Sequence, residues 1–100
     1  MQGTILIIDG VSTNRIMLKV QLSAAYYHVV QNDGIEGLEA LIRRTRPELI
    51  VTAMTLPDGT AHDVRTILNR NDSMRDIPVI AVAATNDRTS QFAALKGGID

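Results

Sequence analysis

Residues 47–59 read PELIVTAMTLPDG, an apolar run that leads directly into a loop of turn-forming residues. Residues 49–51 have the unbroken apolar character of a strand that is buried on both faces of a parallel sheet. The stretch then places Ala53 at the end of this strand and offers no further carboxylate until Asp58. Ligands of parallel sheets bind beyond the carboxyl ends of the strands, so this loop bears on chemistry as well as on fold.

Three further strand patterns surround this run. Residues 4–8 and 77–84 are continuous apolar segments typical of buried strands, and residues 26–31 form a shorter β-rich run. Proline at position 78 is compatible with a strand only near the strand's start. A short helix that contains Phe92 and Leu95 is expected after the last of these strands.

Helical periodicity fills the intervals between the strands. Ser12 or Thr13 is expected to cap the first helix, and Thr60 and Asp63 have the spacing of a capping box for the third. Pro47 ends the second helix. The residues assigned to the inner faces of these helices are Val11, Leu18, Leu22 and Ala25; Leu38, Leu41 and Ile42; and Val64, Ile67 and Leu68.

The resulting βαβαβαβα order predicts an α/β domain with a doubly wound parallel sheet. Residues 1–100 form a single domain, because the connections are too short for independent units. The carboxyl edge of this sheet should collect Asp9 and Gly10, Ala53 to Thr55, and Ala83 to Thr85. Any chemistry of the domain is expected there.

Composition excludes several classes of function. The chain has 45% hydrophobic residues and a formal net charge of −1, which provides no positive field for nucleic acid or for an anionic membrane surface. It contains no cysteine, so disulfides and thiolate metal sites are absent. No signal peptide or long apolar segment is present, and the expected location is the cytoplasm.

Four motifs carry a resemblance to a known family. They are LIID at residues 6–9, PELIV at 47–51, LPD at 56–58 and IPVIAVAA at 77–84. Together they resemble the flavodoxin-like receiver (CheY-like) domain of two-component response regulators. Residues 9–29, DGVSTNRIMLKVQLSAAYYHV, are particularly similar to the first receiver of PleD-like diguanylate cyclase response regulators.

This resemblance also implies how the chain is organised. The last strand and helix of the receiver fold would lie beyond Asp100. The chain would then be the N-terminal part of a longer, multidomain response regulator.

The resemblance assigns roles to the residues at the sheet edge. The acidic pair of the family becomes Asp9 and Gly10, the phosphoacceptor aspartate becomes Ala53, and the conserved hydroxyl becomes Ala83. An acyl phosphate requires a carboxyl oxygen, so a methyl group cannot accept a phosphoryl group. One carboxylate, with the backbone carbonyl near Thr55, is a poor set of ligands for Mg²⁺, and neither tight Mg²⁺ binding nor any other cofactor is expected.

The leading hypothesis is therefore a degenerate receiver, or pseudo-receiver, that is not itself an enzyme. It would act as a protein interaction or dimerisation adaptor in a bacterial phosphorelay, with a partner protein, a second copy or neighbouring domains of the same chain. A diguanylate cyclase output domain is among the attachments that the resemblance implies. Ile16 and Val20, at helical spacing on the side of the first helix away from Leu18, are candidates for the interaction surface, although exposed aliphatic residues are common.

Two other functions remain open. A small phosphatase or phosphotransferase similar to the haloacid dehalogenases would use Asp9 as nucleophile, but the general acid expected two residues later is Val11. Alternatively, a small molecule or a partner would switch the domain through the space left by Gly10, Ala53 and Ala83.

Three polar groups each have two interpretations. Asp9 is either a remaining functional carboxylate or a cap for the following turn, and Asp58 is either a relocated phosphoacceptor or a turn residue. Arg43, Arg44 and Arg46 either bind phosphate or complement the dipole of the second helix.

Overall fold

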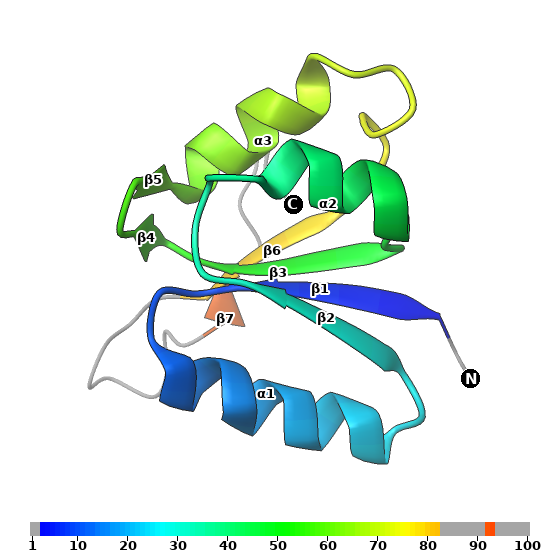
Figure 1. Cartoon of the computed structure of the whole chain (residues 1–100), viewed down its shortest axis with the longest axis vertical. Coiled ribbons are helices and arrows are strands. Elements are labelled where there is room, and N and C mark those ends of the chain that lie inside the picture. Colours follow the sequence, from blue (N-terminus) through cyan, green and yellow to red (C-terminus); the bar gives the residue numbers. More distant parts are fainter. Residues whose placement is uncertain (1–2, 83–91, 94–100) are drawn as a thin grey trace.

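The computed structural model describes residues 3–82 and 92–93 (Figure 1). The elements follow one another as β1 (Thr4–Ile8), α1 (Ser12–Ala24), β2 (His28–Asn32), α2 (Leu38–Thr45), β3 (Leu49–Ala53), β4 (Thr55–Leu56), β5 (Gly59–Thr60), α3 (Ala61–Asn69), β6 (Val79–Val82) and β7 (Phe92–Ala93).

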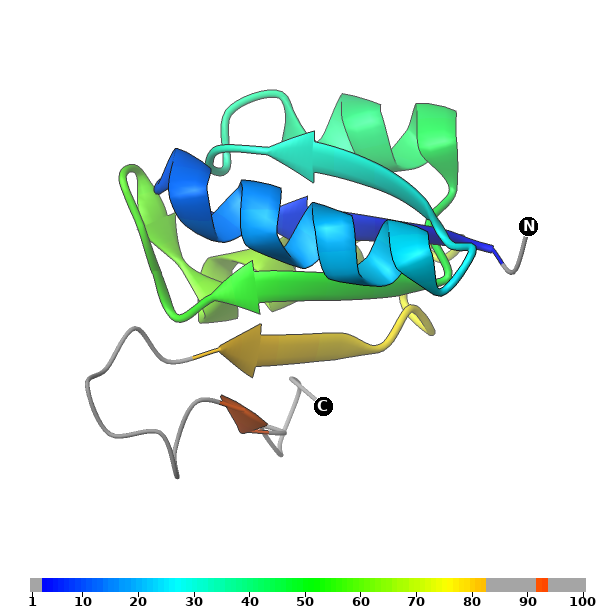
Figure 2. The same cartoon turned by 90° about the horizontal axis from the view of Figure 1, so that it is seen from below.

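The main sheet has the strand order β2-β1-β3-β6-β7, as Figure 2 shows from below. The first four strands are parallel, with Ile7 beside Val51 and Val51 beside Ile80. This is the beginning of the 2-1-3-4-5 order of flavodoxin-like folds, so the predicted doubly wound sheet is confirmed. The central strand β1 is buried from Ile5 to Ile8, as its unbroken apolar sequence predicts.

Helices cover both faces of the sheet. In Figure 1, α2 and α3 lie on one face and α1 lies on the other. The capping box of Thr60 and Asp63 opens α3 as predicted, because each residue's side chain bonds the other's backbone N–H. The predicted inner faces of these two helices are confirmed by the buried residues Leu38, Leu41, Ile42, Val64, Ile67 and Leu68.

The first helix is less buried than predicted. None of the residues of α1 is fully buried; Leu18 and Leu22 are half-buried, while Val11 and Ala25 at the two ends of the predicted stripe are exposed. The N-cap is Val11 rather than Ser12 or Thr13, and it makes no side-chain capping bond. With 13 residues, α1 is far shorter than a membrane span, and no other helix of the described part qualifies as one.

Strand β2 begins two residues later than the predicted start at Tyr26. Tyr26 has a φ of 69° and lies in the left-handed region. The N–H of Tyr26 donates to the carbonyl of Ser23, and the N–H of Tyr27 donates to that of Leu22. This pair of bonds is the Schellman motif, so residues 25–27 belong to the end of α1 rather than to the strand.

Two short elements differ from the predictions. The loop after β3 contains a small antiparallel hairpin in which Thr55 of β4 pairs with Thr60 of β5. The helix expected around Phe92 is wrong at that residue, because β7 pairs antiparallel with β6 and places Phe92 beside Val82. This pairing satisfies backbone groups of β6 that would otherwise lie at an open sheet edge. The remainder of that predicted helix, including Leu95, lies outside the described residues.

Candidate functional site

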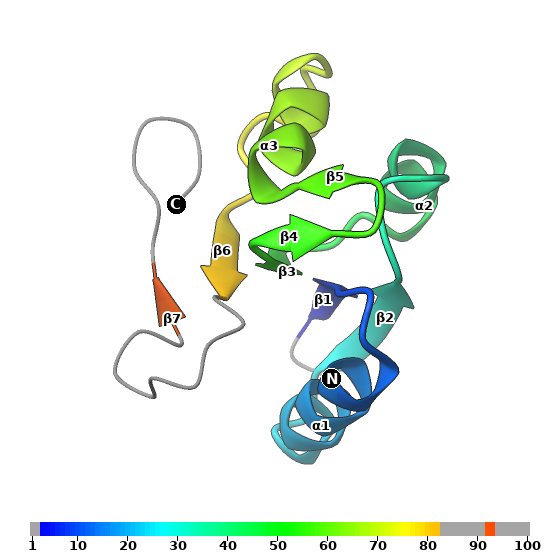
Figure 3. The ribbon, with the colours of Figure 1, turned by 90° about the vertical axis from the view of Figure 1, so that its left-hand side faces the viewer.

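The site predicted from the sequence lies where β1, β3 and β6 end. These strands are parallel and pair Ile8 with Thr52 and Ala53 with Val82, so their carboxyl ends share one edge of the sheet. Figure 3 views the molecule from this edge, with the β4–β5 hairpin in front of the strands. Asp9 and Gly10 follow β1, whereas Ala83 lies outside the described residues.

The carboxylate of Asp9 is hydrogen-bonded to the start of α1. Its Oδ1 accepts a 2.8 Å bond from the N–H of Val11, and its Oδ2 accepts a 3.2 Å bond from Nδ2 of Asn14. In addition, the guanidinium of Arg15 donates to the backbone carbonyl of Asp9 at 2.6 Å. The bond from Val11 to Asp9 spans two residues and forms an Asx turn, as expected if Asp9 caps the turn after β1.

Gly10 lies against the ring of Pro57. A Cβ atom built on Gly10 would lie 2.7 Å from both Cγ and Cδ of Pro57, which is closer than real Cβ contacts permit. The proline comes from the turn between β4 and β5 and occupies the space that a side chain at position 10 would need. The second acid of a receiver pocket is thus absent, and its place is also filled.

Ala53 ends β3 as a buried methyl group within the hydrophobic core. The neighbouring Thr52 is fully buried, and its hydroxyl donates a 3.0 Å bond to the carbonyl of Ala53. Thr55 is exposed, and its backbone pairs with Thr60 in the hairpin. The strand end therefore presents no carboxylate where the resemblance places the phosphoacceptor.

Asp58 fixes one loop of the site to another. Its Oδ1 accepts a 2.8 Å bond from the N–H of Ile35, and its Oδ2 accepts a 2.9 Å bond from the N–H of Glu36. Both bonds hold the pKa of Asp58 below its ordinary value, and the bond from Ile35 has the larger effect. Gly34 leaves room for this contact, since a Cβ there would collide with the Asp58 carboxylate. The sequence gives no sign of this bridge, because its partners lie more than twenty residues apart.

The receiver fold implies Mg²⁺ at this edge, but the groups present do not fit that ion. Mg²⁺ prefers octahedral oxygen coordination with one or two carboxylates. Both carboxylate oxygens of Asp9 are used by α1, Gly10 has no side chain, and Ala53 offers only a methyl group. Across residues 3–82 and 92–93, no three acidic or histidine side chains are placed to share a metal ion. Weak or absent Mg²⁺ binding stays a prediction.

The two predicted interaction residues are on the surface of α1. Ile16 and Val20 are 57% and 64% exposed, and Met17 beside them is 61% exposed. Ile16 and Val20 are one helical turn apart, so the three exposed apolar side chains lie close together on α1. Their position is compatible with contact to a partner.

Sequence comparison finds relatives among response regulators. No family model matches the chain. It is 29% identical to the phosphate regulon transcriptional regulatory protein PhoB of Pseudomonas aeruginosa, over 97% of this chain and 42% of PhoB. Identity is also 29% to the polar-differentiation response regulator DivK of Brucella anthropi, over 100% of this chain and 81% of DivK. The response regulator PleD of Caulobacter vibrioides matches equally at 29%, over 98% of this chain but 22% of PleD.

Structural comparison gives the same class of protein. The N-terminal domain of a response regulator receiver protein from Methanoculleus marisnigri superposes with a TM-score of 0.79 at 18% identity, covering 91% of this chain and 74% of that one. The chemotaxis response regulator CheY4 of Vibrio cholerae has a TM-score of 0.78 at 16% identity, covering 89% and 74%. At these identities the structures show the shared fold, while the sequence relatives are response regulators. Together they show that the chain has the flavodoxin-like fold of CheY-like receiver domains and is similar in sequence to response regulators.

Proposed function

We propose that this receiver domain is degenerate and works in two-component signalling without being phosphorylated. The observation that carries the proposal is the buried methyl group of Ala53 at the end of β3, where a working receiver needs a nucleophilic carboxylate. The two carboxylates considered as possible substitutes do not replace it. Asp9 is bonded to α1 and Asp58 is bonded to the loop after β2.

In place of phosphorylation, the domain would act as an adaptor that binds protein. The exposed apolar residues Ile16, Met17 and Val20 of α1 are the surface that supports this role. The partner would be a second copy, another protein or a neighbouring domain. The chain spans only 42% of PhoB and 22% of PleD, so in those relatives a receiver is joined to further sequence. A diguanylate cyclase output domain and a cytoplasmic location are part of this proposal.

Two competing functions have less support. A phosphatase that uses Asp9 would need a general acid at position 11, which is Val11, and it would need a free carboxylate at Asp9. A ligand in the space left at Gly10 would have to displace Pro57. Within residues 3–82 and 92–93, no contact favours either alternative.

Light scattering tests the adaptor role. The molar mass of the intact protein is measured over a range of micromolar concentrations, with and without Mg²⁺ and acetyl phosphate. Self-association that neither reagent changes, and that Ile16→Asp or Val20→Asp abolishes, is the result expected for a homodimer. Lys19→Asp, on the same helix, is the control that should leave the mass unchanged.

A monomer at every concentration would exclude the homodimer and direct the search to a different partner. An association that requires acetyl phosphate would contradict the proposal itself.

A further inference from the structure

A hollow of about 310 Å³ lies between the last turn of α2 and the loop that joins α3 to β6. This is the end of the sheet at which β3 and β6 begin, opposite the receiver site (Figure 1). The apolar part of its lining, which we call the floor, consists of Ile42, Pro47, Met74 and Ile77, and Ser73 contributes a hydroxyl beside them. Arginines 43 and 46 line it as well. We call this hollow the α2–α3 groove.

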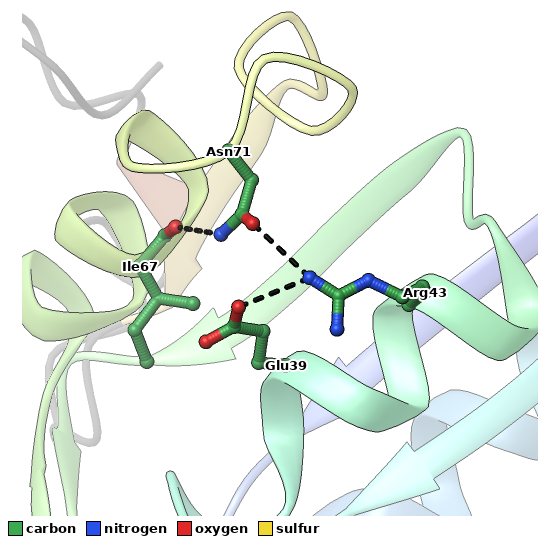
Figure 4. Close-up of polar contacts among 4 residues, drawn as sticks. All are labelled: Glu39, Arg43, Ile67 and Asn71. Atoms are coloured by element: carbon green, nitrogen blue, oxygen red, sulfur yellow. Dashed lines mark hydrogen bonds and ion pairs between the residues drawn. The ribbon is translucent and has the colours of Figure 1, made fainter.

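Arg43 lines the groove. Its guanidinium is held in place by two other side chains (Figure 4). Its Nη2 donates a 3.2 Å bond to Glu39 and a second 3.2 Å bond to the side-chain oxygen of Asn71. Asn71 is itself fixed, because its Nδ2 donates a 3.0 Å bond to the carbonyl of Ile67. A guanidinium has five N–H donors, so this cation is oriented while its Nε and Nη1 have no acceptor among the described residues.

Arg46 occupies a backbone position that favours glycine. It is the C-cap of α2 and has a φ of 49°, which is unfavourable for a residue with a Cβ atom. Its side chain is exposed and makes no hydrogen bond or ion pair within the described part of the chain. Arg43 and Arg44 already place cations in the last turn of the helix, so the helix dipole does not require Arg46.

The opposite wall of the groove is also fixed. Arg65 is buried in α3, and its guanidinium donates bonds of 2.8 Å and 2.6 Å to the carbonyls of Ile77 and Arg75. These bonds hold the loop that contributes Met74 and Ile77 to the floor. A groove with fixed walls loses little conformational entropy when it is occupied.

We propose that the α2–α3 groove binds an acidic peptide segment of a partner protein. An apolar side chain of the peptide would lie on the floor, and a carboxylate beside it would meet the guanidinium groups of Arg43 and Arg46. The apolar floor favours such a segment over inorganic phosphate or a nucleic acid backbone, which have nothing to bury there. This inference names a surface separate from the receiver site and does not depend on the loss of phosphorylation.

An NMR titration of the intact, ¹⁵N-labelled protein tests this proposal. The probe is the synthetic peptide acetyl-Glu-Glu-Leu-Glu-Glu-amide. A second peptide, with alanine in place of leucine, serves for comparison. Amide shifts are expected in residues 42–46 and 73–77. Both Arg43→Gln and the alanine peptide should weaken binding by about tenfold or more, as expected when a charge-assisted contact or an apolar anchor is lost.

The variant Arg46→Gly distinguishes an effect on peptide binding from an effect on protein stability. Glycine is favoured at this φ, so the variant should be at least as stable as the natural protein and yet bind the peptide more weakly. Lys19→Gln removes one exposed cation from α1 and should leave peptide binding unchanged. Peptide shifts confined to other residues, or unchanged affinity in Arg46→Gly and Arg43→Gln, would overturn the proposal. So would displacement of the peptide by equimolar inorganic phosphate, which would indicate a simple anion site.

Discussion

At the scale of single residues, Gly10 and Pro57 show that the receiver site is closed as well as chemically altered. Gly10→Ala should lower the free energy of unfolding by about 1–3 kcal/mol, because the new methyl group collides with the proline ring. In a Pro57→Ala background the same change should cost much less, because the two residues are coupled. Urea unfolding of the four proteins measures this coupling. Equal costs in both backgrounds would show that the ring does not fill the site.

Asp58 makes the stability of the folded protein depend on pH in the acid range. Two backbone N–H groups hold its pKa below the ordinary value of 3.8, so the folded state is stabilised while the carboxylate is charged. That contribution is complete above pH 3.8 and is lost as the pH falls through the lower pKa of the folded state. Asp58→Asn should therefore unfold more easily at neutral pH, and its difference from the natural protein should shrink in acid.

Urea titrations between pH 7 and pH 3 follow this difference. Glu36→Gln is a suitable control, because it removes an exposed carboxylate from the same loop and leaves the two bonds in place. A difference that stays constant down to the lowest pH would mean that the charge of Asp58 does not stabilise the loop.

At the scale of the elements, Arg65 connects α3 to the segment that leads into β6. Arg65→Met keeps the apolar stem but leaves the carbonyls of Arg75 and Ile77 without their donors. The free energy of unfolding should fall by about 2 kcal/mol, because two partly buried carbonyls lose hydrogen bonds to a charged donor. Arg44→Met, at an exposed position on α2, should change it by less than about 0.5 kcal/mol. Thermal or urea unfolding compares the two, and similar losses would refute the assigned role of Arg65.

Local signals explain which elements were predictable. The capping box of Thr60 and Asp63 and the buried stripe of α2 are set by residues three or four apart, and both were correct. The sequence predicts the start of β2 too early because Tyr26 takes a left-handed conformation at the end of α1, where glycine is the usual residue. The local sequence predicts a helix at Phe92, whereas pairing with β6 makes this residue part of a strand.

At the scale of the whole molecule, the fold was predictable and the closure of its site was not. Parallel strands bring Asp9 and Ala53 to one edge by topology alone, so the sequence sufficed to place them. Pro57 over Gly10, and Asp58 on the loop after β2, join segments far apart in the chain. Neither sequence periodicity nor a motif predicts such contacts, so they become visible only in the structure.

The central claim is that a receiver fold persists here without a phosphoryl acceptor. Intact-mass spectrometry after incubation with acetyl phosphate and Mg²⁺ tests it most directly. The natural protein should gain no phosphoryl group. The variant Gly10→Asp, Ala53→Asp, Ala83→Thr, combined with Pro57→Ala to clear the site, should gain one, since it restores the carboxylates and the hydroxyl. A stable phosphoryl adduct on the natural protein would contradict the account.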